Sequence, residues 1–167
     1  MPDSDLAYIG ASEALRMFRN GQLSPVELLE AQLARIAASA KSLNAVCFTY
    51  ADEALEQARR AEARYAARAP DMRPLEGIMT ALKDENMMAG KVTTYGSLLY
   101  AGKVASTNAP VVQRLLDAGA IVHARTTTPE FSCAPFCHSR QWGITRNPWN
   151  ADFTPGGSSG GSGAALA

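Results

Sequence analysis

The chain has 167 residues, the size of one ordinary domain. Sixteen basic residues balance sixteen acidic ones, so the chain lacks the basic excess that favours binding to nucleic acid or an anionic membrane. Apolar residues make up 47% and charged residues 19%, which excludes a disordered chain, and no apolar run approaches the ~20 residues of a membrane-spanning helix.

The cysteines and the N-terminus predict the compartment. Three cysteines, Cys47, Cys133 and Cys137, are too few for a disulfide scaffold and odd in number. Residues 1–5 are acidic and lack the basic-then-apolar plan of a signal peptide. We therefore expect a reduced, cytoplasmic protein.

Two helices are expected at the start of the chain. The first covers 12–20, and Gly21 is a suitable C-terminal cap. The second begins at the sequence SPVE, residues 24–27, where a capping serine precedes a proline and a glutamate follows three residues later. A periodic apolar face carries this helix to about Ala40.

The rest of the chain alternates strands with helices. A strand is expected at 45–50, followed by a long helix at 52–69 that Pro70 ends. The further expected elements are a strand at 77–82, a helix from Asn108 to Gly119, a strand at 120–124 and a short helix that opens at Thr128. This order predicts an α/β fold whose opening helices cover the sheet, with no linker that would divide the chain.

The most unusual segment is the Gly/Ser-rich stretch 154–163. Composition alone would make it a flexible linker. An aromatic turn at 147–150 precedes it, however, and the apolar run 164–167 that follows is the expected start of a buried helix, so we favour a strained, closely packed loop. A phosphate-binding loop is disfavoured, since no lysine follows the glycines and no clear strand leads into them.

Lys83 ends the apolar run 77–82 and allows two interpretations. A surface lysine would lay its stem along the strand end and keep its ammonium group in water. A buried lysine would be able to act as a base in its neutral form. The sequence alone does not choose between them.

A loose cluster of Cys133, Cys137 and His138, with His123 upstream, raises the question of a metal site. Zinc sites use tighter, paired spacings, so we expect a structural or pocket-lining role. A nucleophile–base pair of Cys137 and His138 is disfavoured, because the side chains of adjacent residues point apart.

Six motifs, in one order, resemble the amidase signature family, and the resemblance extends over nearly the whole chain. They are GIMTALKD (77–84), TTYGS (93–97), LLDAGAIV (115–122), TTPEF (127–131), TRNPWN (145–150) and PGGSSGGS (155–162). The resemblance implies an α/β/α fold around a mixed sheet with N-terminal covering helices. Residues 1–167 would be the N-terminal portion of a single amidase domain, truncated after the Gly/Ser-rich loop.

The family's chemistry, as the resemblance implies it, is hydrolysis of an amide through a Ser–cis-Ser–Lys triad and an acyl-enzyme. Lys83 matches the catalytic lysine, and Ser158 matches the serine on a cis peptide bond. Ser159 is a supporting residue, and Ser132 and Cys133 are candidates for substrate contact. No metal, nucleotide or organic cofactor is implied.

The nucleophilic serine has no match in this sequence. In the family it lies in a second glycine-rich stretch downstream, and Ser162 matches no nucleophile position. We therefore expect the chain by itself to have no amidase activity and, with apolar faces and sheet edges uncovered, to aggregate or to depend on further sequence.

Two alternatives remain beside a stand-alone amidase. The chain resembles the amidase-type subunit of tRNA-dependent amidotransferases too, although the segment 132–139 does not look like the usual version of that stretch. A non-catalytic remnant that binds a ligand or partner would account for the missing nucleophile. The expected partner is a small-molecule amide, with a homodimer as a further expectation for a full-length protein, and the motifs do not indicate which amide is used.

Overall fold

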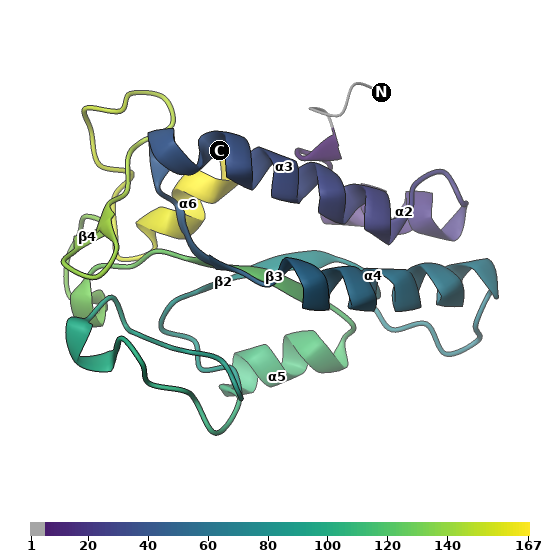
Figure 1. Cartoon of the computed structure of the whole chain (residues 1–167). Coiled ribbons are helices and arrows are strands. Elements are labelled where there is room, and N and C mark those ends of the chain that lie inside the picture. The colour runs from purple at the N-terminus through teal and green to yellow at the C-terminus, as the bar shows by residue number, and fades with distance from the viewer. Residues whose placement is uncertain (1–5) are drawn as a thin grey trace. The chain divides into compact units, whose positions relative to one another are not determined.

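The structure is a computed structural model that describes residues 6–167, so the acidic stretch at 1–5 lies outside the described residues. The described residues form two compact units, and Figure 1 labels most of their helices and strands. The first comprises 6–37, 50–80 and 114–123, and the second comprises 38–49, 81–113 and 124–167.

Helices supply most of the first unit, and their ends follow local signals in the sequence. Helix α2 (Ala11–Arg19) ends before Gly21, which has a φ of 67° and donates to the Phe18 carbonyl oxygen (3.2 Å). Helix α3 (Pro25–Leu43) begins with the predicted capping box, in which Ser24 N donates to the Glu27 carboxylate (2.8 Å). Both predicted helices are confirmed.

Helix α4 (Ala51–Ala66) confirms the third predicted helix but is shorter than expected. We expected Pro70 to end it, whereas the chain leaves the helix earlier, because Arg68 adopts a left-handed conformation with a φ of 49°. The residues between the helix and Pro70 form a turn instead.

The apolar core of the first unit joins these helices to the strands. The Phe18 ring is buried beside Tyr65, with ring centroids 5.5 Å apart, and truncating Phe18 to alanine would cost about 3–5 kcal/mol. The buried residues of this core are Ala14, Phe18, Leu23, Leu28, Leu29, Ala54, Ala58, Ile78, Met79 and Ile121. The prediction that the opening helices cover the sheet is confirmed by this shared core.

The sheet has the strand order β1-β3-β2, with β1 at Val46–Thr49, β2 at Met79–Lys83 and β3 at Ile121–Thr126. Strand β1 pairs antiparallel with β3. Ile121 N donates to Ile78 O, and Asp84 N donates to Thr126 O. The residue numbers therefore increase in the same direction along both strands, so β2 runs parallel to β3. Helix α5 (Pro110–Asp117) lies in the connection between them. The predicted α/β class with a mixed sheet is confirmed.

Strand β3 is buried along its whole length, as expected for a central strand covered on both faces. Its sequence, IVHART, nevertheless includes His123, Arg125 and Thr126. Because buried polar groups need partners, the second half of this strand indicates a polar network rather than a simple apolar core.

The second unit contains several short elements that the sequence did not predict. They are the 3-10 helix η1 (Leu98–Tyr100) and the two-stranded hairpin of β4 (His138–Ser139) and β5 (Gly143–Ile144). The expected short helix after Thr128 is the 3-10 helix η2 (Glu130–Ser132). The last helix, α6 (Gly160–Leu166), begins inside the glycines rather than at Ala164. Among residues 6–167, no helix is long and apolar enough to cross a membrane.

Candidate active site

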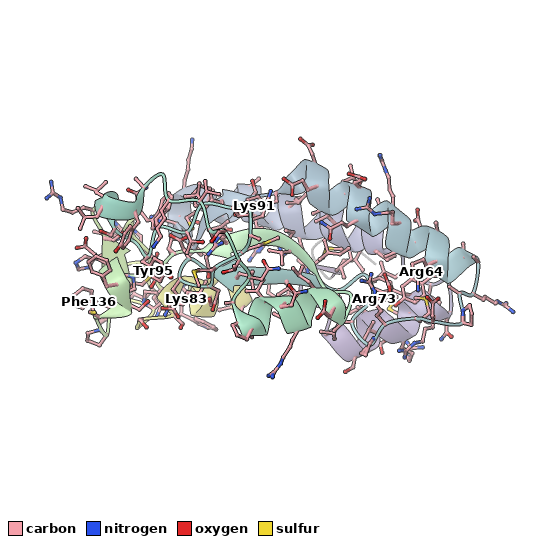
Figure 2. The ribbon with its side chains drawn as sticks, turned by 90° about the horizontal axis from the view of Figure 1, so that it is seen from below. Arg64, Arg73, Lys83, Lys91, Tyr95 and Phe136 are labelled. Atoms are coloured by element: carbon pink, nitrogen blue, oxygen red, sulfur yellow. The ribbon has the colours of Figure 1, made fainter. Side chains whose placement is uncertain are left out.

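Lys83 is the last residue of β2, and its side chain is only 8% exposed. Its Nζ lies 2.8 Å from Ser158 Oγ and 3.2 Å from the carboxylate of Glu85. Figure 2 labels Lys83 among the side chains. Of the two interpretations of this residue, the buried lysine is the one the structure supports, with its amine held by a hydroxyl and a carboxylate.

Ser158 lies just before α6, and the peptide bond between Gly157 and Ser158 is cis. The glycines around it allow close packing against neighbouring chain. A Cβ at Gly157 would lie 2.7 Å from Phe136 N, and one at Gly161 would lie 2.4 Å from Thr127 Oγ1. Since no side chain fits at such distances, this segment is closely packed, and the linker interpretation is wrong.

Side chains from three segments connect Lys83 and Ser158 in a closed ring of polar contacts. The Glu85 carboxylate pairs with Lys83 and accepts a hydrogen bond from Ser132 Oγ. Ser132 Oγ lies 3.0 Å from Thr128 Oγ1, which donates to the Ser158 carbonyl oxygen (3.3 Å). The ring therefore holds both partners of the lysine amine.

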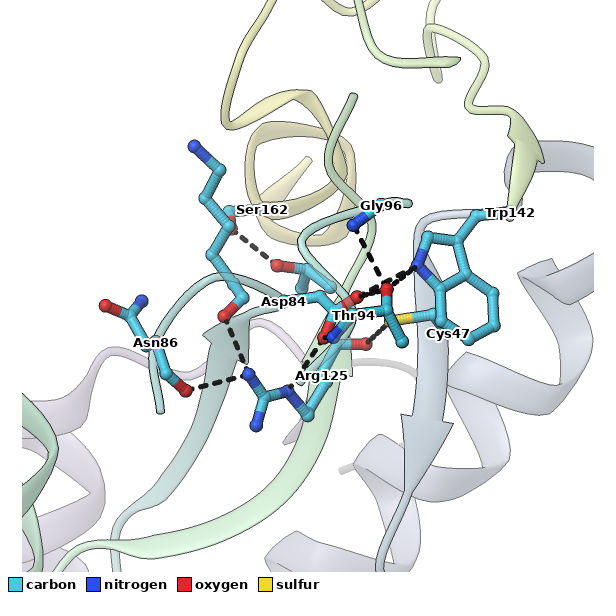
Figure 3. Close-up of polar contacts among 10 residues, drawn as sticks. Cys47, Asp84, Asn86, Thr94, Gly96, Arg125, Trp142 and Ser162 are labelled. Carbon is cyan, nitrogen blue, oxygen red and sulfur yellow. Dashed lines mark hydrogen bonds and ion pairs between the residues drawn. The ribbon is translucent and has the colours of Figure 1, made fainter. Parts of the chain in front are cut away.

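A second, deeper cluster surrounds Asp84, which is completely buried beside Lys83. Its Oδ1 accepts from Thr94 N (3.1 Å), and its Oδ2 accepts from Thr94 Oγ1 and from Trp142 Nε1 (2.9 Å). Arg125 Nε lies 3.5 Å from Oδ1 (Figure 3). A buried carboxylate costs several kcal/mol unless it is paired in this way, so these partners fix the chain at the end of β2.

Arg125 extends this cluster to the backbone that carries the lysine. Its Nη2 donates to the carbonyl oxygens of Lys83 (3.3 Å) and Asn86 (2.8 Å). Burial raises the pKa of the neighbouring Cys47 thiol, and the negative charge of Asp84 raises that pKa further. Cys47 is therefore an unreactive packing residue, whose Sγ donates to the Arg125 carbonyl oxygen (3.4 Å).

The other serines of the Gly/Ser-rich segment lie apart from this ring. Ser159 is exposed at the start of α6, and its side chain makes no capping hydrogen bond. Ser162 Oγ lies 2.7 Å from Thr126 Oγ1 on β3 (Figure 3). Ser162 thus joins α6 to the sheet.

The cysteine cluster of the sequence divides into separate environments. Cys133 is exposed, and its Sγ donates to the Phe131 carbonyl oxygen (3.2 Å). Cys137 is buried, with its Sγ 3.6 Å from Thr127 Oγ1. His138 stacks on Phe136, with ring centroids 4.3 Å apart. Within residues 6–167, no group of three or more His, Cys, Asp or Glu side chains could hold a metal ion.

Two residues of η2 adopt left-handed backbone conformations that non-glycine residues rarely take. The φ angles of Phe131 and Ser132 are 52° and 57°. Such a conformation costs on the order of 1–2 kcal/mol per residue. Phe131 N donates to Tyr95 O (2.8 Å), which helps to hold the turn and with it the Ser132 hydroxyl.

Sequence reasoning did not single out Glu85, Thr128 or the pair of Asp84 and Arg125 as site residues. The signal available for Glu85 was its place two residues after Lys83. For Arg125 it was a charge directly after a buried-strand pattern. Neither signal identifies a partner, because the partners come from distant parts of the chain.

Comparisons with known proteins agree on one family. The family model described as Amidase matches residues 27–167. The chain is 43% identical over 167 residues to "Putative amidase AmiB2" of Mycobacterium tuberculosis, covering 100% of this chain and 36% of that protein. It is 40% identical over 164 residues to a glutamyl-tRNA(Gln) amidotransferase subunit of Acidothermus cellulolyticus, covering 98% of this chain and 32% of that protein.

A comparison of structures gives a consistent result. A solved structure of fatty acid amide hydrolase superposes with a TM-score of 0.89 at 26% identity, covering 98% of this chain and 29% of that chain. The present chain therefore spans about a third of the length of the relatives it matches.

Proposed function

The chain belongs to the amidase family, and on that premise we propose that the native polypeptide hydrolyses a carboxylic amide to a carboxylate and ammonia or an amine. The family predicted from the six motifs is thereby confirmed. The reaction, its substrate and the roles of single residues are our proposal.

The contact between Lys83 Nζ and Ser158 Oγ carries the proposal. A neutral Lys83 takes a proton through the Ser158 hydroxyl from a nucleophilic serine, which attacks the amide carbonyl. The resulting ammonium returns a proton through Ser158 to the leaving nitrogen, so the C–N bond breaks and an acyl-enzyme ester remains. Water then cleaves the ester and releases the carboxylate. The short, partly buried contact supports this route, because proton transfer needs the groups within hydrogen-bond reach.

Three further residues receive roles in the proposal. Ser159 is a supporting residue at the start of α6. Cys133 is exposed and available to a substrate. Ser132 is the second candidate for substrate contact, although its hydroxyl already binds Glu85 and lies beside Thr128.

The nucleophile is the part of the triad that these residues do not supply. Ser162 is tied to Thr126, and Ser159 lies outside the ring around Lys83. We therefore propose that the 167-residue chain alone does not hydrolyse amides, and that it is the N-terminal portion of a single amidase domain. The coverage of about a third of each relative supports this. We further propose a small-molecule amide substrate, a cytoplasmic location and a homodimer of the full-length protein.

The second candidate function is that of one component of a tRNA-dependent amidotransferase, favoured by the 40% identity to the amidotransferase subunit of Acidothermus cellulolyticus. A stand-alone amidase would turn over amides without other proteins. An amidotransferase component would require its partner proteins for its characteristic reaction, so the purified native polypeptide distinguishes the two in a simple amide assay.

The first experiment is the intact mass of the native polypeptide, followed by labelling with an acylating or phosphonylating active-site reagent. If the mass clearly exceeds 17.8 kDa, the labelled serine is identified by peptide mapping. If the mass equals 17.8 kDa and the protein still hydrolyses amides, the proposed inactivity of the chain is wrong. A protein of that mass without activity would be a non-catalytic remnant.

Variants of the native polypeptide test the two residues directly. Lys83→Ala and Ser158→Ala should each lower kcat/KM for a chromogenic amide by about 10²–10⁴-fold, because each removes a proton-transfer group. Matched controls are Lys41→Ala and Ser42→Ala, both at exposed positions at the end of α3, which should keep wild-type activity. Wild-type activity in the Lys83 variant would refute the proposed mechanism.

A further inference from the structure

We propose that Glu85 is a positioning residue for Lys83, and that Ser132 acts on the reaction through Glu85. This inference rests on the proposed function, since it assigns Glu85 the task of stabilising the ammonium that Lys83 becomes during proton transfer. It explains a carboxylate that none of the six motifs required.

The geometry gives the Lys83 amine two polar partners, Glu85 and Ser158. Lys83 Nζ lies 3.2 Å from Glu85 Oε1 and 2.8 Å from Ser158 Oγ. The lysine side chain is 8% exposed and that of Glu85 is 35% exposed. Removal of the lysine from water leaves few groups to orient it, so these two contacts fix where the amine points.

The charge of Glu85 suits the state that follows proton transfer. When Lys83 accepts a proton, a positive charge appears in a largely dehydrated place. A carboxylate at 3.2 Å stabilises that charge without having to reorganise. This is the general arrangement in which a third group orients the base that activates a nucleophile.

Ser132 and Thr128 in turn fix the two partners of Lys83. Each hydroxyl has one proton to donate. The Glu85 carboxylate draws the proton of Ser132, because a charged acceptor forms the stronger hydrogen bond, and Thr128 donates to the Ser158 carbonyl oxygen. Because Ser132 gives its proton to Glu85, only Thr128 can donate across the 3.0 Å contact between the two hydroxyls. The single Thr128 proton is therefore shared between Ser132 Oγ and the Ser158 carbonyl oxygen, and it links the two halves of the ring.

The backbone around Ser132 is strained in a way that aims its hydroxyl. Phe131 and Ser132 both have positive φ, and Ser132 N donates to Pro129 O (3.0 Å). Strain of this kind persists where the surrounding structure over-determines it, and it concentrates at functional sites. In this chain the strained residue delivers the hydrogen bond that holds Glu85.

Steady-state kinetics of the native polypeptide with a chromogenic amide test the inference. Glu85→Gln should lower kcat about tenfold to hundredfold and leave KM within about twofold, while Glu85→Asp recovers part of the loss. Ser132→Ala should lower kcat by a smaller factor. The double variant should be no slower than Glu85→Gln alone, because Ser132 acts through Glu85.

The double variant also separates this inference from a substrate contact by Ser132. If Ser132 binds substrate independently, its variant raises KM and the two losses multiply in the double variant, which overturns the inference. Glu85→Gln with wild-type kcat also overturns it. Glu56→Gln, which removes a carboxylate from an exposed pair with Arg60, is the matched control and should keep wild-type kcat.

A labelling measurement keeps this inference distinct from the proposed function. The rate at which an amine-specific reagent modifies Lys83, relative to Lys41, should rise about fivefold in Glu85→Gln, because the amine loses one of the two contacts that hold it in place. An unchanged labelling rate shows that Glu85 does not act on Lys83. If Lys83 is labelled faster in Glu85→Gln and the separate variant Lys83→Ala keeps wild-type activity, the contact between Glu85 and Lys83 exists but the proposed triad is wrong.

Discussion

Two glycines of α6 differ in what surrounds them, and this difference decides what each contributes. A Cβ at Gly161 would lie 2.4–2.5 Å from the side chain and backbone of Thr127. A Cβ at Gly163 would meet nothing within 4 Å. The same residue type is therefore required for close packing at one position and replaceable at the other, although both lie in one short helix.

Alanine at each position tests this difference. Gly161→Ala should lower the free energy of unfolding by about 1–3 kcal/mol, because α6 has to move away from Thr127 to make room. Gly163→Ala is the matched control and should raise it by up to about 1 kcal/mol, since alanine is the better helix former. Urea unfolding followed by tryptophan fluorescence measures both. Equal stabilities would show that α6 does not pack against Thr127.

His123 should make the free energy of unfolding depend on pH. Burial lowers the pKa of His123 to about 4, and a hydrogen bond with the Thr80 backbone opposes this shift in part. The folded pKa lies below the unfolded value, so the unfolded chain binds more protons between pH 6.5 and pH 4. His123 should therefore cost up to about 3 kcal/mol of stability as the pH falls through that window, and nothing above it.

His123→Gln isolates this contribution from the carboxyl groups that titrate at the lower end of the same window. The stability of the wild type, measured by urea unfolding, should fall more steeply from pH 7 towards pH 4 than that of the variant. Parallel curves for the two proteins would mean that His123 is not buried in its neutral form.

Helix α4 is tied at its end to the loop that follows it by a network centred on Glu76, which is almost completely buried. Arg73 donates to both carboxylate oxygens of Glu76 (2.7 Å each), and Arg64 Nε lies 3.4 Å from Oε2. Both arginines are labelled in Figure 2. The hydrogen bonds from Arg73 lower the pKa of Glu76, so the carboxylate contributes stability above its ordinary pKa that is lost as the pH falls.

Glu76→Gln should lower the free energy of unfolding by about 2–3 kcal/mol at neutral pH, because it leaves two arginines without their shared buried carboxylate. Both arginine side chains are partly exposed to water, so the expected loss of unfolding free energy is smaller than for a fully buried ion pair. Glu56→Gln breaks an exposed pair on the same helix and should change the stability by less than about 0.5 kcal/mol. Similar values for both variants would contradict a central role for Glu76.

At the scale of the whole molecule, local signals predicted more of the fold than of the site. The capping box at 24–27 and the apolar patterns of the single strands and helices each depend on a few neighbouring residues, so they could be predicted from the sequence. The ring around Lys83 was not, because Glu85, Thr128, Ser132 and Ser158 come together only through the sheet and the strained turn of η2. The family resemblance pointed to Lys83 and Ser158 in this ring, and to Ser132 as a candidate for substrate contact, but no local pattern indicated the carboxylate.

The second unit also exposes large apolar side chains, and these should govern how the 167-residue chain behaves in isolation. Leu99 is 81% and Leu166 is 84% exposed, and Trp149 and Phe153 are exposed as well. Exposed apolar surface favours association. We expect the isolated chain to self-associate as its concentration rises, and sedimentation velocity or light scattering would measure the average mass.

Substitution of the two leucines connects this behaviour to particular residues. Leu99→Gln combined with Leu166→Gln should shift the isolated chain towards monomer, because both remove apolar surface without touching the core. Lys41→Gln, which changes an exposed polar residue and no apolar surface, should leave the association unchanged. A wild-type chain that stays monomeric at high concentration would contradict the expectation that these exposed apolar side chains drive association.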